Sequence, residues 1–306
     1  MSKKLLSLLV FFLLTSCLFP ATAMAASAEC EMDGTQYDTL EQALAMVGSG
    51  ENKTIKILNH INYNGGIVID EDRSITFDLN GFTVNINNTA AEGQGLSVAS
   101  NSTVDIAGAG SLNVSGTATG VYARGGNATV TNATSQLYPC FAISPGSSIT
   151  VKENAVATGT NSQGAISADR ATVVIDGDVL STGSGVSAAK SAHLTVNGNI
   201  VAENGLGAVS DENSTIIIRG NVNASRVGVK AIYGDTITVD GVITAPIVIS
   251  VYGSERTLDD YDSIGTGSVN GSPVLSSTVW IQIRNTLSMF DWQKQQHRKR
   301  LYPAEF

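Results

Sequence analysis

The sequence is poor in aromatic residues, charge and proline. Only 6% of its 306 residues are aromatic, 15% are charged and six are proline. Apolar residues still make up 42% of the chain, so the composition is not that of a disordered protein. The shortage of aromatic residues indicates a narrow core filled by small branched side chains.

Beyond the N-terminal segment the sequence has no long apolar run. No stretch there approaches the ~20 residues that a membrane span needs. The N-terminus itself has the order of an export signal. Lys3 and Lys4 precede an apolar stretch that ends at Pro20, and Ala23-Met24-Ala25 forms an A-x-A cleavage site. We therefore expect cleavage after Ala25 and an exported, water-soluble product.

A second interpretation of the N-terminus concerns Leu14-Thr15-Ser16-Cys17, which looks like a lipoprotein box. In that case Cys17 is acylated and anchors the protein to a membrane surface. The residues that follow, Leu18-Phe19-Pro20, are apolar where a lipoprotein has a polar tether, so we favour the secreted or cell-surface form without a lipid.

The net charge is −9, and it is unevenly distributed. The first 25 residues contribute +2 and residues 280–306 contribute +3, so residues 26–279 carry −14. An acidic body of this kind argues against nucleic acid and anionic lipid as partners. It is equally an ordinary way to keep a long exported protein in solution.

Cysteine is also scarce, with three residues in all. Apart from Cys17, the chain holds Cys30 and Cys140, which are 110 positions apart. Export permits a disulfide, but pairing depends on geometry that the sequence does not provide. We expect two separate buried thiols and leave a disulfide as the alternative.

What the chain does contain is a repeat of about twenty-two residues between Gly95 and Pro246. Apolar residues recur in phase at Ile175, Val196, Ile218 and Val239, at intervals of 21, 22 and 21. Four repeats open on small residues: Gly164-Ala165-Ile166-Ser167, Gly185-Val186-Ser187, Gly207-Ala208-Val209-Ser210 and Gly228-Val229-Lys230. Periods in this range are typical of solenoids, in which each unit buries its apolar face by stacking on its neighbours.

The regular phase of the repeat separates two all-β architectures. A β-sandwich would join its strands by hairpins, and equivalent residues would not recur at one phase. Stacked units instead place like on like, with parallel strands about 4.8 Å apart. We therefore predict a right-handed, single-stranded parallel β-helix with three short strands in each turn. Extra residues at 107–115 and 131–139 predict two longer rungs.

The region before the repeat predicts a helix over Leu40 to Val47. Thr39 is an N-cap residue with Gln42 three positions later, and Gly48 follows as a stop. A short helix here can cover the apolar end and the open edge of the first rung. The expected organisation is a signal (1–25), an irregular lead and capping helix (26–52), the β-helix (53–253), and a turn region with an atypical, disorder-prone tail (254–306).

Early strands add a resemblance. Thr39-Leu40-Glu41-Gln42-Ala43-Leu44, Thr54-Ile55-Lys56-Ile57-Leu58 and Ser74-Ile75-Thr76-Phe77-Asp78-Leu79-Asn80-Gly81 resemble the opening of bacterial cell-surface proteins with a pectin-lyase-like β-helix. The resemblance covers about residues 37–86. It implies an exported, adhesin-like or stalk module more often than an enzyme. The chain departs from such proteins at its end, where a wall-sorting motif is expected and none occurs.

Residues 280–306 differ from the rest of the sequence. Small residues become rare, both tryptophans occur here, and a basic run includes Arg298, Lys299 and Arg300. Residues 283–301 permit a weakly amphipathic helix that caps the last rung. A truncated or frame-shifted gene end is the other interpretation, and a polyanion site on the basic run is a third.

The resemblance also includes enzymes with a pectin-lyase-like β-helix. These cleave polysaccharides with clustered acids and calcium, or with paired carboxylates. The densest acidic segment, Asp70-Glu71-Asp72-Arg73, lies where an ordinary polar turn is expected, and Asp259, Asp260 and Asp262 follow the last clear repeat. His60, His193 and His297 show no metal-ligand spacing. We therefore expect no catalytic residue, no metal and no cofactor.

The candidate binding residues are aromatic. Tyr122, Tyr138 and Phe141 gather around the longer rung at 131–139, which protrudes if the coil is regular. Tyr138 and Phe141 have an alternative role as covers over the core. The function expected from the sequence is a non-catalytic, exported surface module that contacts carbohydrate or another extracellular surface. A polysaccharide lyase or hydrolase of the same fold is the alternative.

Overall fold

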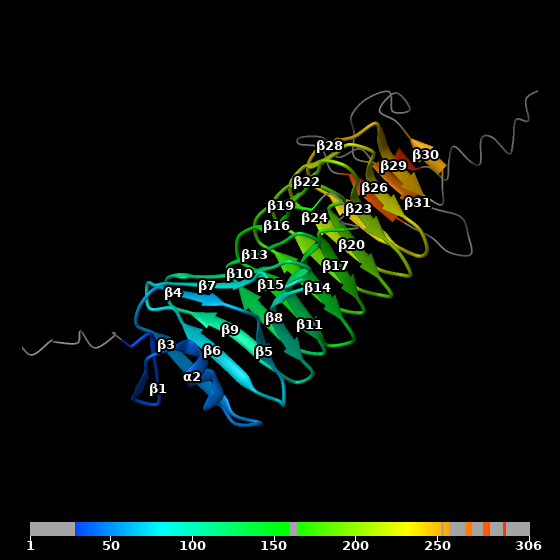
Figure 1. Ribbon diagram of the computed structural model, residues 1–306. Coiled ribbons are helices and arrows are strands. Elements are labelled where there is room, and N and C mark those ends of the chain that lie inside the picture. Colours follow the sequence, from blue (N-terminus) through cyan, green and yellow to red (C-terminus); the bar gives the residue numbers. More distant parts are fainter. Residues whose placement is uncertain are drawn as a thin grey trace, which may run out of the picture.

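The computed structural model describes residues 28–159 and 164–251, together with four short strands at 254–256, 267–270, 278–281 and 290–291. The chain winds into an elongated coil in which three strands follow one another in every turn (Figure 1). The expected export signal, Cys17, the Asp259–Asp262 cluster, His297 and the C-terminal basic run lie outside the described residues.

The first of three long sheets, sheet A, takes one strand from each turn in parallel register. Two antiparallel strands precede it, and short strands follow it at the other end, where β32 pairs in parallel with β27. Its strands are β2 (Thr35–Tyr37), β1 (Cys30–Met32), β3 (Asn52–Ile57), β6 (Ser74–Asp78), β9 (Thr103–Ala107), β12 (Asn127–Val130), β15 (Ser148–Val151), β18 (Thr172–Ile175), β21 (His193–Val196), β24 (Thr215–Ile218), β27 (Thr236–Val239), β32 (Thr278–Ile281), β31 (Gly267–Asn270) and β33 (Phe290–Asp291).

Sheet B contains nine parallel strands, one from each of nine successive turns. It borders the coil along the upper left of Figure 1. Its strands are β4 (Ile61–Asn64), β7 (Thr83–Asn88), β10 (Ser111–Gly116), β13 (Asn132–Ser135), β16 (Ala155–Ala157), β19 (Val179–Ser181), β22 (Ile200–Ala202), β25 (Val222–Ala224) and β28 (Ile243–Thr244).

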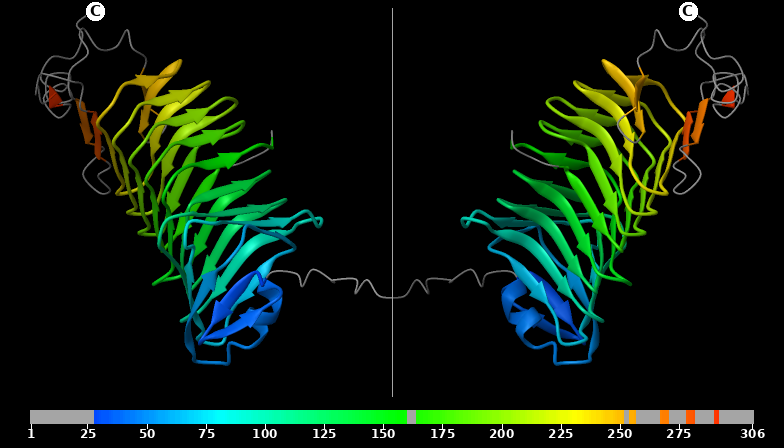
Figure 2. Two further views of the ribbon diagram at one scale, coloured as in Figure 1. Left: turned by 90° about the vertical axis from the view of Figure 1, so that its left-hand side faces the viewer. Right: turned by 90° about the vertical axis from the view of Figure 1, so that its right-hand side faces the viewer.

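Sheet C contains nine parallel strands and one antiparallel strand, β30, at its end. Two further views show the turns of the coil stacked along one axis, so that each sheet runs along the length of the coil (Figure 2). The strands of sheet C are β5 (Ile67–Ile69), β8 (Gln94–Ala99), β11 (Thr119–Arg124), β14 (Tyr138–Ile143), β17 (Ile166–Asp169), β20 (Val186–Ala189), β23 (Leu206–Ser210), β26 (Val227–Ala231), β29 (Ile247–Val251) and β30 (Ser254–Arg256).

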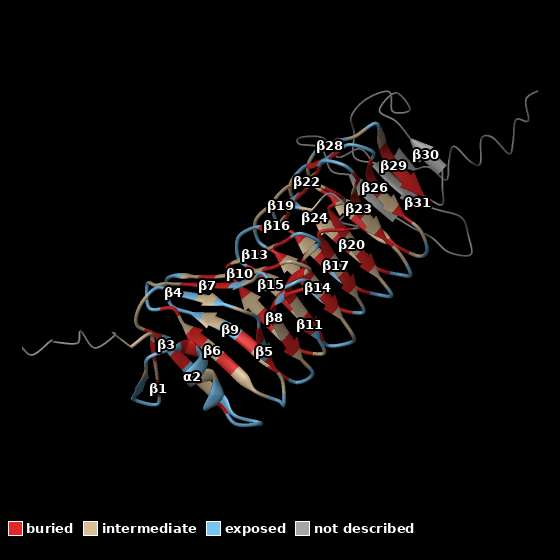
Figure 3. Ribbon diagram, in the orientation of Figure 1, coloured by how far each residue is buried: buried red, intermediate tan, exposed pale blue. Residues whose placement is uncertain are grey.

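The register confirms the predicted parallel β-helix. Ile175 pairs with Val196, Val196 with Ile218, and Ile218 with Val239. All four side chains are fully buried, so they form one apolar column along the axis. Burial alternates along the strands, as the colours of Figure 3 show, because successive side chains of a strand point to opposite faces.

Small residues at the corner between sheets B and C explain how the predicted repeats open. At Gly207, an added Cβ would overlap Cγ1 of Val222 and the carbonyl oxygen of Gly228. Gly185 and Gly228 meet the same kind of obstruction from the next turn. Ala165 occupies the place equivalent to Gly185 in the preceding turn and is itself buried. The corner is therefore tight because adjacent turns of the coil lie in direct contact.

The N-terminal end differs in part from its prediction. The helix α2 (Leu40–Ala45) is present, with Thr39 Oγ1 accepting a hydrogen bond from Gln42 N at 3.3 Å. The helix ends at Ala45, and its C-cap is Met46, whose backbone N–H donates to Ala43 O. Gly48, the predicted stop, lies beyond this cap. The lead is not irregular: β1 and β2 form a hairpin, and β1 pairs with the edge strand β3. A hairpin therefore covers that edge of sheet A.

The expected protruding rung at 131–139 is absent. Asn127 pairs with Ser148 only 21 residues later, and the segment between them holds β13, which pairs with both of its neighbours in sheet B. Residues 107–115 likewise run mostly through β10. A longer interval between paired residues of neighbouring turns lies earlier, between Ser74 and Thr103, which are 29 positions apart. The strand β4, which pairs with β7, was not predicted.

At the other end of the chain, a helix over residues 283–301 is one of the predicted alternatives. Phe290–Asp291 is the part of that segment that the structure describes, and it forms the strand β33.

The apolar column generates a first prediction. Ile218→Asp places a carboxylate between Val196 and Val239, where no partner is available, and substitutions that bury an unpaired charge cost more than about 4 kcal/mol. We expect a large fall in the midpoint of thermal unfolding measured by circular dichroism. Ile217→Asp is the matched control, because Ile217 lies on the opposite face of β24 and is partly exposed. Equal midpoints for the two variants would contradict the inward assignment of residue 218.

Candidate functional site

The three predicted aromatic residues lie together on the outer face of sheet C. Tyr122 in β11 pairs with Phe141 in β14, and their ring centroids are 5.5 Å apart. Tyr138 begins β14 and stacks on Phe141 at 5.4 Å, with ring planes 27° apart. We call these three residues the aromatic row. All three are partly exposed, so the row forms a continuous surface of rings.

The alternative role for Phe141, as a cover over the core, does not match its placement. Cys140 and Ala142 flank Phe141 in the strand and are fully buried, so the ring of Phe141 points away from the interior. The row is held by a rigid sheet and not by a loop. A partly exposed ring offers an apolar face, and rings in pairs prefer such offset or tilted contacts.

A second surface, not predicted from the sequence, lies on the outer face of sheet B. It is a groove of about 420 Å³ across β4, β7, β10 and β13. We call it the asparagine groove because amide side chains dominate its walls. It is lined by Asn62, Asn64, Asn85, Ile86, Asn87, Asn113, Val114, Ser115, Asn132 and Thr134.

One column of the groove is a ladder of amides. Asn85 Nδ2 donates to Asn62 Oδ1 at 2.9 Å, Asn113 Nδ2 donates to Asn85 Oδ1 at 2.9 Å, and Asn132 Nδ2 donates to Asn113 Oδ1 at 3.0 Å. Asn132 Nδ2 also donates to Glu153 Oε2 at 2.8 Å. The sequence signal is an asparagine that alternates with apolar residues at the same phase of four successive turns.

The same column continues along the coil, but its side chains there accept hydrogen bonds from backbone N–H groups. Asn154 Oδ1 accepts from the backbone N–H of Asp178, Asp178 Oδ1 from that of Asn199, and Asn199 Oδ1 from that of Asn221. These side chains hold one turn of backbone to the next. They are structural, whereas the amides of the groove bond mainly to one another.

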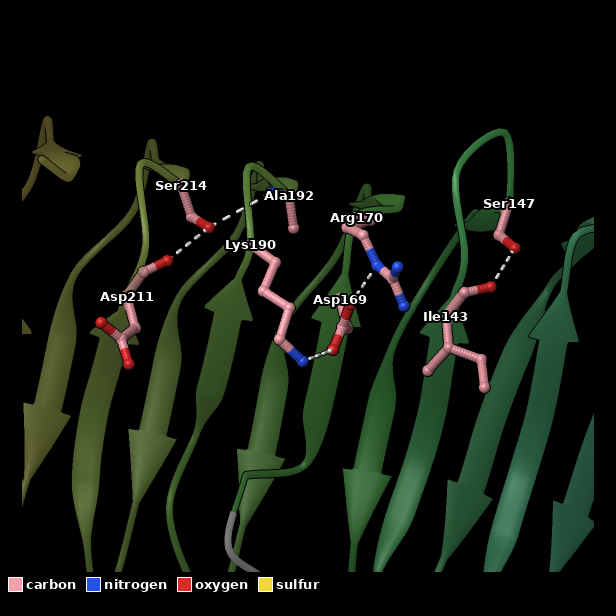
Figure 4. Close-up of polar contacts among 8 residues, drawn as sticks. All are labelled: Ile143, Ser147, Asp169, Arg170, Lys190, Ala192, Asp211 and Ser214. Atoms are coloured by element: carbon pink, nitrogen blue, oxygen red, sulfur yellow. Dashed lines mark hydrogen bonds and ion pairs between the residues drawn. The ribbon is translucent and has the colours of Figure 1, made fainter. Parts of the chain in front are cut away.

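A third set of polar residues occupies the corner between sheets C and A. Ser214 Oγ accepts from Ala192 N at 3.2 Å and donates to the carbonyl oxygen of Asp211 at 2.7 Å (Figure 4). The buried carboxylate of Asp235 accepts from the backbone N–H groups of Ser214, Ile232 and Tyr233, each at 2.9 Å. Burial raises the pKa of Asp235, although these three donors oppose the shift. The corner uses its polar atoms to satisfy backbone groups.

Three charged residues at this corner, Asp169, Arg170 and Lys190, form ion pairs. Lys190 Nζ donates to Asp169 Oδ2 at 2.7 Å and Arg170 Nε to Asp169 Oδ1 at 2.9 Å (Figure 4). Burial by itself raises the pKa of Asp169, but the hydrogen bonds from Lys190 and Arg170 lower it overall. Partly exposed pairs like these add little to stability. They leave Asp169 ionised and engaged, which does not suit a general acid.

The acidic segment at residues 70–73 forms a turn. Arg73 pairs with Asp70 at 2.5 Å and also donates from Nε to the Asp70 carbonyl oxygen at 3.0 Å. Glu71 and Asp72 are exposed in the left-handed conformation, with φ of 57° and 60°. The two carboxylates therefore point from a tight turn into solvent, in agreement with the polar turn expected there.

Histidine and acidic residues do not converge on a metal site in the part of the chain that the structure describes. His60 Nδ1 accepts from Thr83 N at 3.1 Å, and its ring meets Phe82 edge-on. His193 stands exposed between Thr172 and Thr215 on sheet A. His60 therefore has a local structural role.

Residues 94–242 match the family model described as right handed beta helix region. That description covers enzymes such as pectate lyases as well as proteins without enzymatic activity. The match and the register together make the chain a right-handed parallel β-helix. No curated protein and no solved structure gives a significant match.

Among the described residues, no helix combines the length and the apolar character that a span requires.

The thiols of Cys30 and Cys140 are not bonded to each other, and both are buried. Burial, with the nearby charge of Glu29, raises the pKa of Cys30 to about 11. Burial also raises the pKa of Cys140 well above its ordinary value. Because the thiolate is the reactive form, neither residue is suited to act as a nucleophile.

This burial generates a second prediction. A maleimide reagent at pH 8 should label neither Cys30 nor Cys140 in the folded protein, because each thiol is protonated and out of reach. Both should react after denaturation. Peptide mass spectrometry distinguishes the two sites, and the denatured sample is the positive control. Rapid labelling of Cys140 in the native protein would show that sheet C is open at this position.

Proposed function

We propose that this protein is an exported, non-catalytic β-helix module that contacts glycans of an extracellular surface through the aromatic row. The observation that supports this proposal most strongly is the row itself. Tyr138, Phe141 and Tyr122 are consecutive rings on one outer face of a rigid sheet. Stacked rings are suited to the apolar face of a sugar, because sugar rings also present flat C–H surfaces.

Export is supported by the N-terminal order of charge, apolar run and A-x-A site. The anchoring alternatives are a free secreted form and acylation at Cys17. The non-catalytic part of the proposal is supported by the places of the acids. Among the described carboxylates, Asp169 and Asp70 are held in ion pairs, and Asp178 and Asp235 are held by backbone N–H groups. A glycosidase needs two carboxyl groups that face each other across a substrate.

The aromatic row generates a third prediction. We expect the protein to bind glycans on an array of plant, fungal and animal polysaccharides. Phe141→Ala should weaken that binding by at least about tenfold, as expected when a central aromatic anchor is truncated. Val209→Ala is the matched control, because Val209 lies three turns along the same outward column and outside the row.

The enzymatic alternative is tested with the same preparation. Polygalacturonate and mucin are incubated with the protein, and new reducing ends and unsaturated products are measured. Turnover of either polymer would overturn the non-catalytic proposal. Equal glycan binding by wild type and Phe141→Ala would overturn the role of the aromatic row.

A further inference from the structure

The asparagine groove has the properties of a binding surface and not only of a structural ladder. Its volume of about 420 Å³ falls within the range of small-molecule sites, roughly 300–1,000 Å³. It spans four successive turns, so equivalent positions repeat about every 4.8 Å along it. The walls are built from side chains on strands, which hold their positions better than loops do.

The ladder leaves a defined set of polar atoms facing outward. An asparagine amide has two N–H donors and two acceptor sites. Asn85 and Asn113 each donate one N–H to the preceding residue and accept one hydrogen bond from the following residue. One donor and one acceptor therefore remain on each of these amides. The orientation is fixed before any ligand arrives, which lowers the entropy cost of binding.

A second column runs parallel to the ladder. Asn64 pairs in register with Asn87, Asn87 with Ser115, and Ser115 with Thr134. The side chains of Asn64 and Asn87 are exposed, and Ser115 Oγ donates to Asn87 Oδ1 at 2.7 Å. The groove thus offers two parallel rows of amides and hydroxyls, and each row repeats with the turns of the coil.

The charge of the lining limits the class of ligand. No charged side chain lines the groove, although the body of the protein carries −14. Glu153, outside the lining, accepts a hydrogen bond from Asn132. With no lysine or arginine to pair with, a carboxylate or phosphate polymer has nothing to neutralise it there, and the acidic body repels it. Uncharged hydroxyl groups, which both donate and accept, match the amides.

We propose that the asparagine groove is a binding site for a neutral, linear polysaccharide, whose repeated hydroxyl groups meet the repeated amides along the coil. This inference deepens the proposed contact with glycans, but it places a second site on a different sheet from the aromatic row. The ligand runs across β4, β7, β10 and β13, while the aromatic row lies on β11 and β14.

Isothermal titration calorimetry tests this site with four probes: cellohexaose, mannohexaose, laminarihexaose and, as the anionic comparison, hexagalacturonate. We expect at least one neutral hexasaccharide to bind and hexagalacturonate to bind less tightly or not at all. Asn64→Ala and Asn87→Ala should each weaken the neutral ligand by at least about fivefold, the effect of one lost hydrogen bond.

Asn223→Ala is the matched control. Asn223 is exposed in β25, in the same outward column of sheet B, but outside the groove. The Asn223→Ala variant should bind the neutral hexasaccharide with the affinity of the wild type. Thermal melts of all variants accompany the titrations, and unchanged midpoints show that a loss of affinity is not a loss of fold.

The outcomes separate this inference from the proposed function. If Phe141→Ala removes binding while Asn64→Ala and Asn87→Ala retain it, the groove site is wrong and the aromatic row stands. The reverse result supports the groove and overturns the aromatic row. If none of the neutral hexasaccharides binds, or hexagalacturonate binds most tightly, the groove proposal is overturned, and the array decides the proposed function separately.

Discussion

Parallel hydrogen bonding between successive turns is the constraint on which the rest of this structure depends. Each strand pairs with its counterpart one turn away, so every side chain lies directly above the residue at the same phase of the repeat. Inside the coil this produces apolar columns such as Ile175, Val196, Ile218 and Val239. Outside the coil the same geometry produces the amide ladder, in which one asparagine donates to the next.

The corners follow from the same constraint. Adjacent turns approach so closely between sheets B and C that glycine is needed at 207 and 228, where a Cβ would overlap the neighbouring turn. Between sheets C and A the chain turns with residues in the left-handed conformation, among them Arg170 and Asn213. The backbone groups freed there are satisfied by Ser214 and by the buried carboxylate of Asp235. Polar residues at these corners therefore stabilise the fold by bonding to backbone groups.

Much of the fold could be predicted from the sequence because the repeat carries it directly. The spacing of Ile175, Val196 and Ile218 determines which residues stack, and the alternation within each unit determines which face inward. The helix at residues 40–45 was predictable from its N-cap. The hairpin β1–β2 was not, because its strands have three residues each, too few for an alternating pattern to stand out in the sequence. The prediction of a protruding rung at 131–139 was wrong because Asn132–Ser135, a strand with few apolar residues, resembles a loop in sequence.

Of the two candidate sites, one was predicted from the sequence and the other was not. Tyr122, Tyr138 and Phe141 were chosen as aromatic residues that gather around residues 131–139, and the register brings them into one row. The asparagine groove was missed because each asparagine is unremarkable alone. Only the superposition of Asn62, Asn85, Asn113 and Asn132 creates a surface, and that superposition depends on turn lengths between them of 23, 28 and 19 residues. Unequal turns hide such a column from a search for a fixed period.

The most direct test of in-register stacking is a set of distances between spin labels on the outer face of sheet A. One label is placed at Thr238 and the second at Thr129, Thr150 or Val174, which are five, four and three turns away in the register. Double electron–electron resonance should give backbone separations that fall in equal steps of about 4.8 Å, from about 24 to about 14 Å. Distances that do not decrease by one constant step per turn would contradict the stacked coil.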